Sequence, residues 1–318
     1  MTVLVCSDPA LGAYHFGASH PFGPYRMDAF LAACHRQGLE HRFIPYPSQT
    51  ADEDTLRLFH TPEYVSRVRE AEANGEAWLD QGDTPVMPGI FDAASRVVGT
   101  TLAGIDRILA GEGRRAFTPI AGLHHARRDR AAGFCVFNDC GVAIEYLRRK
   151  HGLQRIAYVD IDAHHGDGVF YGFETDPDVV IVDFHEDGRY LYPGTGMATE
   201  TGRGPARGTK RNVPLPMGAD DVTFARLWPG ALGFLRAARP EFVLLQCGAD
   251  SLEGDPITHL AFTANVHAIV TRDLCRLADD FCDGRLLVMG GGGYNPGNIG
   301  TAWGAVVSAL LAPHSSSA

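Results

Sequence analysis

Carboxylates and imidazoles follow an apolar run in the middle of the chain at every second position. Asp160, Asp162 and His164 follow residues 155–159 directly. In an extended backbone, alternate residues point to one side, so these three side chains should share a face. An Asp-x-His pair of this kind can bind one divalent cation. A metal or catalytic site is favoured over a solvated turn, because so apolar a run rarely ends by chance in several acids and histidines.

Polar residues also follow three other apolar runs of the sequence. His124 and His125 follow one run, Asp250 follows a second, and Tyr294 ends the four glycines that follow a third. In open parallel sheets, ligands bind beyond the carboxyl ends of the strands, so these segments should converge at one edge. We therefore expect a single site that is assembled from four distant parts of the chain.

The converging residues include a three-ligand set for a catalytic zinc. Asp162, His164 and Asp250 offer two carboxylates and one imidazole, and such a set leaves a fourth position for water. A hydrolytic metal site also needs groups that take and give protons, and imidazole titrates in the right range. The sequence therefore predicts a metal-dependent hydrolase in which His124 and His125 move protons.

Three further residues fit around these groups. Asp160 and Asp167 can each stand behind one of the two histidines, fix its tautomer and tune its basicity. Tyr294 can donate a hydrogen bond from its phenol to a developing oxyanion. The glycines at 290–293 satisfy neither common phosphate-binding pattern, so a nucleotide loop is not expected.

Short apolar runs alternate with helical patterns along the chain. This order predicts one α/β domain, with a parallel sheet covered by helices on both faces. We expect buried strands at residues 3–5, 42–44, 116–120, 156–160, 179–184, 242–246 and 286–289. We expect helices at residues 61–73, 90–110, 139–151, 219–238 and 264–280.

Composition narrows the classes of protein that need to be considered. The 318 residues include 28 Lys and Arg against 38 Asp and Glu, a net charge of −10. That balance argues against a nucleic-acid or anionic-membrane partner and suits a cationic substrate. Without a long apolar stretch or a leader pattern, we expect a cytoplasmic protein. Seven cysteines without a Cys-x-x-Cys pair suit a reducing compartment.

These motifs, taken together and in their order, resemble those of the histone deacetylase superfamily. The stretch at residues 184–193 looks most like the bacterial acetoin-utilization branch. The resemblance implies the arginase/deacetylase fold, a single α/β domain with a mainly parallel eight-stranded sheet. It would span residues 1–312, with a disordered tail at 313–318. The matching segments are residues 124–125, 133–139, 160–168, 193–196, 248–250, 254–256 and 290–295.

The resemblance assigns the same chemical roles and adds residues around the substrate. It gives the zinc to Asp162, His164 and Asp250, the acid/base work to His124 and His125 backed by Asp160 and Asp167, and transition-state donation to Tyr294. A narrow tunnel would be walled by Gly133, Phe134 and Tyr192, with Ile257 near its rim. Tyr192 departs from the phenylalanine that is usual in the family.

Two more positions and a second ion follow from the same resemblance. Asp83 aligns with a rim aspartate that holds the substrate backbone, and Arg26 with an arginine of the inner cavity where acetate leaves. Relatives also bind potassium beside the zinc through main-chain carbonyls, here those of residues 160–164 and 183–184.

The expected reaction is hydrolysis of the acetyl amide of an acetyl-lysine protein or peptide, with one Zn²⁺ per chain. An acetylpolyamine deacetylase is the alternative that suits the acidic net charge, although Ile257 offers no carboxylate to a polyamine cation. An arginase-like manganese enzyme would need more acids for a second metal. A non-catalytic, metal-bound reader of acylated tails would not need the full set of His124, His125 and Tyr294.

Overall fold

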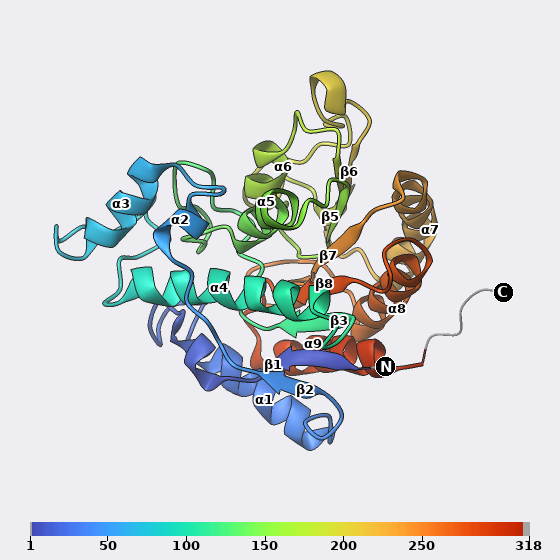
Figure 1. Cartoon of the computed structure of the whole chain (residues 1–318), viewed down its shortest axis with the longest axis horizontal. Helices are drawn as coiled ribbons and strands as arrows, with labels where there is room; N and C mark the ends of the chain where they lie inside the picture. The colour runs from blue at the N-terminus through green and yellow to red at the C-terminus, as the bar shows by residue number, and fades with distance from the viewer. Residues whose placement is uncertain (1, 314–318) are drawn as a thin grey trace.

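The computed structural model describes residues 2–313, and its strands form one sheet. The order across the sheet is β2-β1-β3-β8-β7-β4-β5-β6, and every neighbouring pair is parallel (Figure 1). The eight-stranded parallel sheet that we expect is therefore confirmed. The strands are β1 (Val3–Cys6), β2 (Ile44–Tyr46), β3 (Arg115–Thr118), β4 (Ile156–Asp160), β5 (Val179–Glu186), β6 (Lys210–Leu215), β7 (Phe242–Gln246) and β8 (Leu286–Met289).

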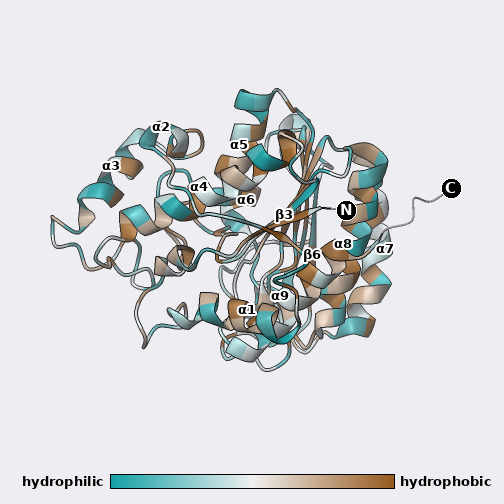
Figure 2. Cartoon of the chain, turned by 60° about the horizontal axis from the view of Figure 1, so that its bottom comes forward, coloured by the Kyte–Doolittle hydropathy of each residue, from teal (hydrophilic) through white to brown (hydrophobic). Residues whose placement is uncertain are grey.

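Helices cover both faces of this sheet. Helix α4 packs on β1, β3 and β8, whereas α8 packs on β7 and β8 from the opposite side (Figure 2). Helix α5 packs against α4, and α9 lies between α1 and α8. The α-helices are α1 (Tyr25–Arg36), α2 (Glu53–Leu56), α3 (Pro62–Ala71), α4 (Ile90–Leu109), α5 (Asp139–His151), α6 (Asp167–Gly172), α7 (Asp221–Ala238), α8 (Ala264–Phe281) and α9 (Pro296–Leu311).

The inner strands form the core because every one of their residues is buried. Strands β4, β5, β7 and β8 show no alternation of buried and exposed positions. This pattern is expected of a parallel sheet with helices on both faces. All seven cysteines are free and buried, in agreement with their expected place in the core.

The sequence pattern misses one strand and misplaces the bounds of four others, of which β1 and β5 extend one and two residues past their expected ends, to Cys6 and Glu186. Strand β6 carries Lys210, Arg211, Asn212 and Pro214, which an edge strand tolerates but an inner strand would not. The expected strand at 42–44 is β2, two residues further on. The strand expected at 116–120 ends at Thr118, since Ile120 has a left-handed φ of 66°.

Helices α1, α2, α6 and α9 also lie outside the expected set. Helix α9 contains Gly297, Gly300 and Gly304, which lower its intrinsic helix propensity. Two of these glycines face α1: a Cβ at Gly300 would lie 3.0 Å from Ala33, and one at Gly304 would lie 2.5 Å from Gln37. The glycines therefore serve the close approach of α1 and α9.

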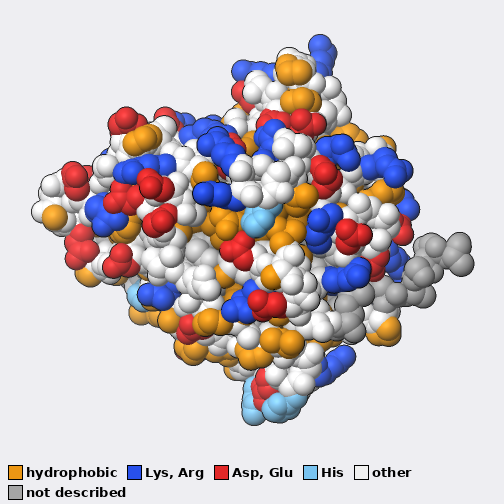
Figure 3. All heavy atoms as spheres, in the orientation of Figure 1, with side chains coloured by type: hydrophobic (Ala, Val, Ile, Leu, Met, Phe, Trp, Pro, Cys, Tyr) orange, Lys and Arg blue, Asp and Glu red, His pale blue; other side chains and the backbone are white. Residues whose placement is uncertain are grey.

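Of the tail expected to be disordered, residues 314–318 lie outside the described residues. Between residues 2 and 313, no helix has the length and apolar character needed to cross a membrane. On the face seen in Figure 3, basic and acidic side chains are intermixed.

The sheet order explains how four distant segments can meet. Strands β3, β8, β7 and β4 are consecutive neighbours. Their carboxyl ends lead, respectively, to His124 and His125, to the glycines before Tyr294, to Asp250 and to Asp162. Because parallel strands end at the same edge, the central four strands deliver all four segments to one place.

Candidate active site

Asp162, His164 and Asp250 form a buried cluster at the carboxyl end of the sheet. Their donor atoms lie within 4.8 Å of one another. His164 Nδ1 is 3.1 Å from Asp162 Oδ1 and 3.2 Å from Asp250 Oδ2. Ligand atoms bound to one zinc at roughly 2.0–2.2 Å are spaced by about 3–3.5 Å. The cluster therefore fits a single small cation.

The charges of the cluster also indicate a site for a cation. Asp250 Oδ2 is buried and accepts no hydrogen bond from the residues that the structure describes. Burial and the neighbouring Asp162 carboxylate raise the pKa of Asp250 to about 7. Two buried carboxylates this close repel each other, and a divalent cation between them would remove that repulsion.

Backbone and amide donors hold the two carboxylates in place. Asp162 Oδ2 accepts hydrogen bonds from Gly292 N and Gln246 Nε2, each at 2.8 Å, and Asp250 Oδ1 accepts from Ala163 N at 3.0 Å. A Cβ at Gly292 would lie 2.1 Å from Asp250 Oδ2. Only glycine therefore allows this backbone to approach the cluster, and the remaining carboxylate oxygens stay directed at His164.

Two carboxylates stand behind the tandem histidines. His124 Nδ1 is 2.8 Å from Asp160 Oδ2, and His125 Nδ1 is 2.7 Å from Asp167 Oδ1. The two Nε2 atoms lie 3.1 Å apart. Both rings thus use Nδ1 for the carboxylate and present Nε2 to the same point. The arrangement can accept a proton at one ring and donate one from the other.

The surroundings separate the basicities of the two rings. Burial opposes the charged form of His124, but the carboxylates of Asp160 and Asp162 outweigh it and raise its pKa to about 10. Burial and the charge of His124 lower the pKa of His125 to about 4. One imidazole is therefore a proton donor and the other an acceptor at neutral pH.

Tyr294 completes the small cavity around these groups. The cavity is lined by Tyr294, both tandem histidines and two residues of the buried cluster, Asp162 and His164. Burial and the charges of Asp250 and Asp162 raise the pKa of the Tyr294 hydroxyl well above its usual value. The phenol therefore keeps its proton and can act as a hydrogen-bond donor.

Comparisons with known proteins agree with this geometry. The family model of the histone deacetylase domain matches residues 20–310. The chain belongs to the histone deacetylase family. It is 38% identical over 299 residues to the acetoin utilization protein AcuC of Bacillus subtilis, covering 90% of this chain and 76% of that protein. It is 34% identical over 304 residues to histone deacetylase B of Dictyostelium discoideum, covering 93% of this chain and 70% of that protein.

Family membership makes the chain a deacetylase, which confirms the predicted enzyme class. Histone deacetylases are generally metal-dependent, and the buried Asp-His-Asp cluster is a group that could bind the metal. Similarity extends to plants, where histone deacetylase 19 of Arabidopsis thaliana is 35% identical over 308 residues, which are 93% of this chain and 59% of that protein.

Aromatic rings lie beside the histidines and tyrosine around the cluster. The ring of Tyr192 lies edge-on to His125 at 5.0 Å, and the ring of Phe134 lies edge-on to Tyr294 at 5.8 Å. A Cβ at Gly133 would lie 2.5 Å from the His125 ring and 2.9 Å from Tyr192. The residues expected to wall a tunnel thus stand beside the histidine and tyrosine that they should enclose.

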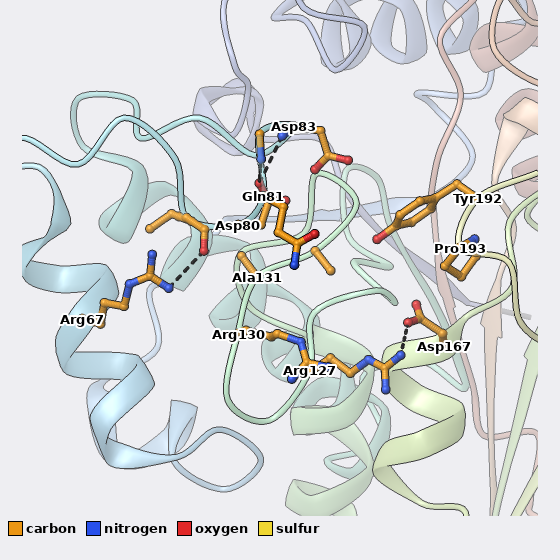
Figure 4. A pocket seen from close by; sticks show the side chains of 13 residues that line it. Arg67, Asp80, Gln81, Asp83, Arg127, Arg130, Ala131, Asp167, Tyr192 and Pro193 are labelled. Carbon is orange, nitrogen blue, oxygen red and sulfur yellow. Dashed lines mark hydrogen bonds and ion pairs between the residues drawn. The ribbon is translucent and has the colours of Figure 1, made fainter.

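A wider cavity of about 760 Å³ adjoins these walls (Figure 4). Tyr192 and Asp83 lie on its border, with Arg127 and Arg130 along the opposite part. Burial and the neighbouring Asp80 raise the pKa of Asp83 to about 7. Arg127 Nη2 donates to Asp167 Oδ2 at 2.6 Å, so the wall of the cavity reaches the carboxylate behind His125.

Arg26 and Ile257 lie on other sides of the candidate site. Arg26 is buried and donates to the carbonyl oxygens of Gly291 and Gly293, at 2.5 and 2.9 Å. Arg26 therefore supports the glycine loop from within. The half-buried Ile257 is in the loop after Asp250, and its backbone N–H donates to Asp255 Oδ1 at 3.1 Å.

Several residues that organise the site escape sequence reasoning. Gln246 ends β7 and holds Asp162, Arg127 holds Asp167, and Asp255 bonds the backbone of Tyr294. These three residues lie in or next to segments that match family motifs. Their residue types and spacing do not reveal which groups they bind. Gln246 carries the clearest signal, because a polar residue at the end of an apolar run points into the same edge as Asp162.

Proposed function

We propose that the chain hydrolyses the acyl amide of an Nε-acetyl-lysine-type substrate with one zinc ion, releasing acetate and a free amine. The observation that carries this proposal is the meeting of the buried Asp-His-Asp cluster with two carboxylate-backed imidazoles. Zinc, when bound, supplies a Lewis acid and makes water a nucleophile at neutral pH. Asp162, His164 and Asp250 would hold it.

The chain's own residues would move the protons. His125, held through Nδ1 by Asp167, accepts a proton at Nε2 from the attacking water. Water oxygen bonds to the acyl carbon, the carbon–nitrogen bond breaks, and the imidazole pair returns a proton to the departing amine nitrogen. Tyr294 donates its hydroxyl hydrogen to the oxygen of the acyl group while negative charge develops there.

The cavity beside the tunnel favours a peptide over a free polyamine. About 760 Å³ of open space borders Asp83 and Tyr192, room that the residues flanking an acyl-lysine would use. Ile257 provides no carboxylate for the cationic nitrogens of a polyamine. The acetylpolyamine alternative is still supported by the net charge of −10.

A substrate panel with metal analysis tests the proposal. We expect about one zinc per chain, and a higher kcat/KM for an acetyl-lysine peptide than for acetylspermidine. Faster turnover of acetylspermidine would replace the proposed substrate by a polyamine. A zinc-loaded preparation that cleaves neither compound nor any longer acyl-lysine would refute the proposed reaction.

A further inference from the structure

The backbone that carries Tyr294 has little to hold it from within its own loop. Gly291 and Gly293 have φ values of +74° and +126°, and no side chain extends from residues 290–293. Glycine leaves a backbone free to take several conformations. The direction of the Tyr294 phenol must therefore be set by contacts from other segments.

Arg26 binds the carbonyl oxygens of Gly291 and Gly293, whereas Asp255 binds the backbone N–H of Tyr294 itself. Asp255 Oδ2 accepts a hydrogen bond from Tyr294 N at 2.8 Å, and its Oδ1 accepts one from Ile257 N at 3.1 Å. Asp255 is only 8% exposed. A carboxylate that accepts from backbone N–H groups makes charge-assisted bonds, which are stronger than neutral ones.

Tyr25 holds the other side of the same residue. Its hydroxyl lies 2.9 Å from Tyr294 O and 2.9 Å from Pro21 O, so one proton is shared between two carbonyls. The N–H of Tyr294 is thus fixed by a loop after β7, and its C=O by helix α1. These two elements lie far apart in the sequence.

Asp255 is itself attached to a rigid element. Asn295 Nδ2 donates to Gly254 O at 3.1 Å, and Asn298 Nδ2 donates to Leu252 O at 3.3 Å. Asn295 also caps helix α9 by accepting from Gly297 N. The turn that carries Asp255 is therefore tied to the first turn of α9, and the distance between them is fixed.

We propose that Asp255 is a positioning residue for Tyr294: with Tyr25 it clamps the backbone of that residue and keeps the phenol directed at the acyl oxygen. The inference rests on the proposed role of Tyr294. Catalytic donors act only when held close to the productive geometry, and a displacement of about 1 Å can cost roughly a hundredfold in rate.

The replacement Asp255→Asn tests the clamp with little change of shape. Tyr294 N and Ile257 N donate to different oxygens of Asp255, and in an asparagine one of these oxygens is replaced by an NH2 group, which cannot accept. We expect kcat to fall roughly tenfold to 100-fold, with KM within about twofold and zinc content unchanged. If the carboxylate only stabilised the fold, its replacement would lower the melting temperature but leave kcat per folded molecule unchanged.

A double-mutant cycle separates this role from a general one. If Asp255 acts through the phenol, Asp255→Asn should cause no further loss in a Tyr294→Phe background. Losses that multiply in the double variant would overturn the inference, as would near-normal kcat of Asp255→Asn alone. Near-normal turnover by Tyr294→Phe alone would instead remove the proposed role of Tyr294, and with it the clamp, while the proposed hydrolysis would stand.

Two further variants complete the experiment. Asp221 also bridges two segments, accepting from Thr263 N at 2.7 Å and Thr263 Oγ1 at 2.6 Å, away from the site. Asp221→Asn is the matched control and should retain wild-type kcat. Should Asp255→Asn fail to fold, Tyr25→Phe decides: a severalfold loss of kcat with unchanged KM supports the clamp, and unchanged kcat overturns it.

Discussion

Among single residues, Tyr294 is the one whose proposed contribution is easiest to isolate. It binds no metal in the proposed site, and its protonated phenol is a donor without a carboxylate behind it. Its effect should therefore be confined to the transition state. The residues proposed to bind the cation and those proposed to move protons lack this separation, because their loss would alter several steps at once.

Tyr294→Phe should lower kcat roughly 10²–10³-fold, the usual cost of losing one oxyanion donor. Zinc content and melting temperature should remain those of the parent, because only the hydroxyl is removed. Initial rates on an acetyl-lysine peptide and zinc per chain measure both. Tyr146→Phe, which removes a hydroxyl bonded to Asp106 on the surface, is the control. Equal rates for the two variants would exclude Tyr294 from the chemistry.

At the scale of elements, helix α5 is tied to the active-site loop through its N-cap. Asn138 accepts from Gly141 N at 2.8 Å, and its Nδ2 donates to Ala126 O at 2.8 Å. The N–H of Asn138 donates to His60 Nε2 at 2.9 Å. This last bond requires the His60 ring to be neutral at Nε2, so the attachment of α5 depends on pH.

Burial lowers the pKa of His60 to about 3, whereas an unfolded histidine titrates near pH 6.5. Between these two pKa values the unfolded chain binds a proton that the folded chain does not. The contribution of His60 to the free energy of unfolding is therefore fully present above pH 6.5 and is lost as the pH falls. The loss between pH 7 and pH 5 should be about 2 kcal/mol. His60→Gln, whose amide oxygen can still accept from Asn138, should lack this part of the pH dependence.

Urea unfolding at pH 7, 6 and 5 measures this contribution as the difference between parent and variant. The exposed His41 supplies the control, and His41→Gln should keep the parent's full pH dependence. Equal slopes for the parent and His60→Gln would contradict the assigned protonation.

For the whole molecule, the metal should contribute to stability because the folded chain alone assembles its ligands. Binding to the folded state stabilises by about 2.7 kcal/mol at a hundredfold excess over Kd. Removing zinc with a chelator should therefore lower the melting temperature by several degrees. Restoring zinc should reverse the shift. The variant Asp250→Ala should show no response to either treatment, and a parent that melts equally with and without zinc would contradict the assignment.

The sequence predicts the fold and the location of the site more fully than the contacts within it. Asp162, His164 and Asp250 are foreseeable because each follows a strongly apolar run. The contact of Asp255 with Tyr294 cannot be foreseen, because the donor is a backbone N–H about forty positions away. Every residue except proline has such a donor, so the sequence does not show which one a carboxylate will bind. Strand β6 and helix α9 are not predicted for a related reason. Pro214 and Gly300 lower the strand and helix propensity of their segments, and each is accommodated because of the neighbours against which its element lies.

The order of strands has a consequence for synthesis on the ribosome. Strands β1 to β6 emerge first and can pair only as two separate groups, β2-β1-β3 and β4-β5-β6, because β7 and β8 lie between them. The nascent sheet therefore stays open at its middle until residues 242–289 leave the exit tunnel. A truncated product that ends before Asp250 would lack both the bridge between the groups and one of the proposed metal ligands. Retention of the metal would therefore report that translation has passed that point.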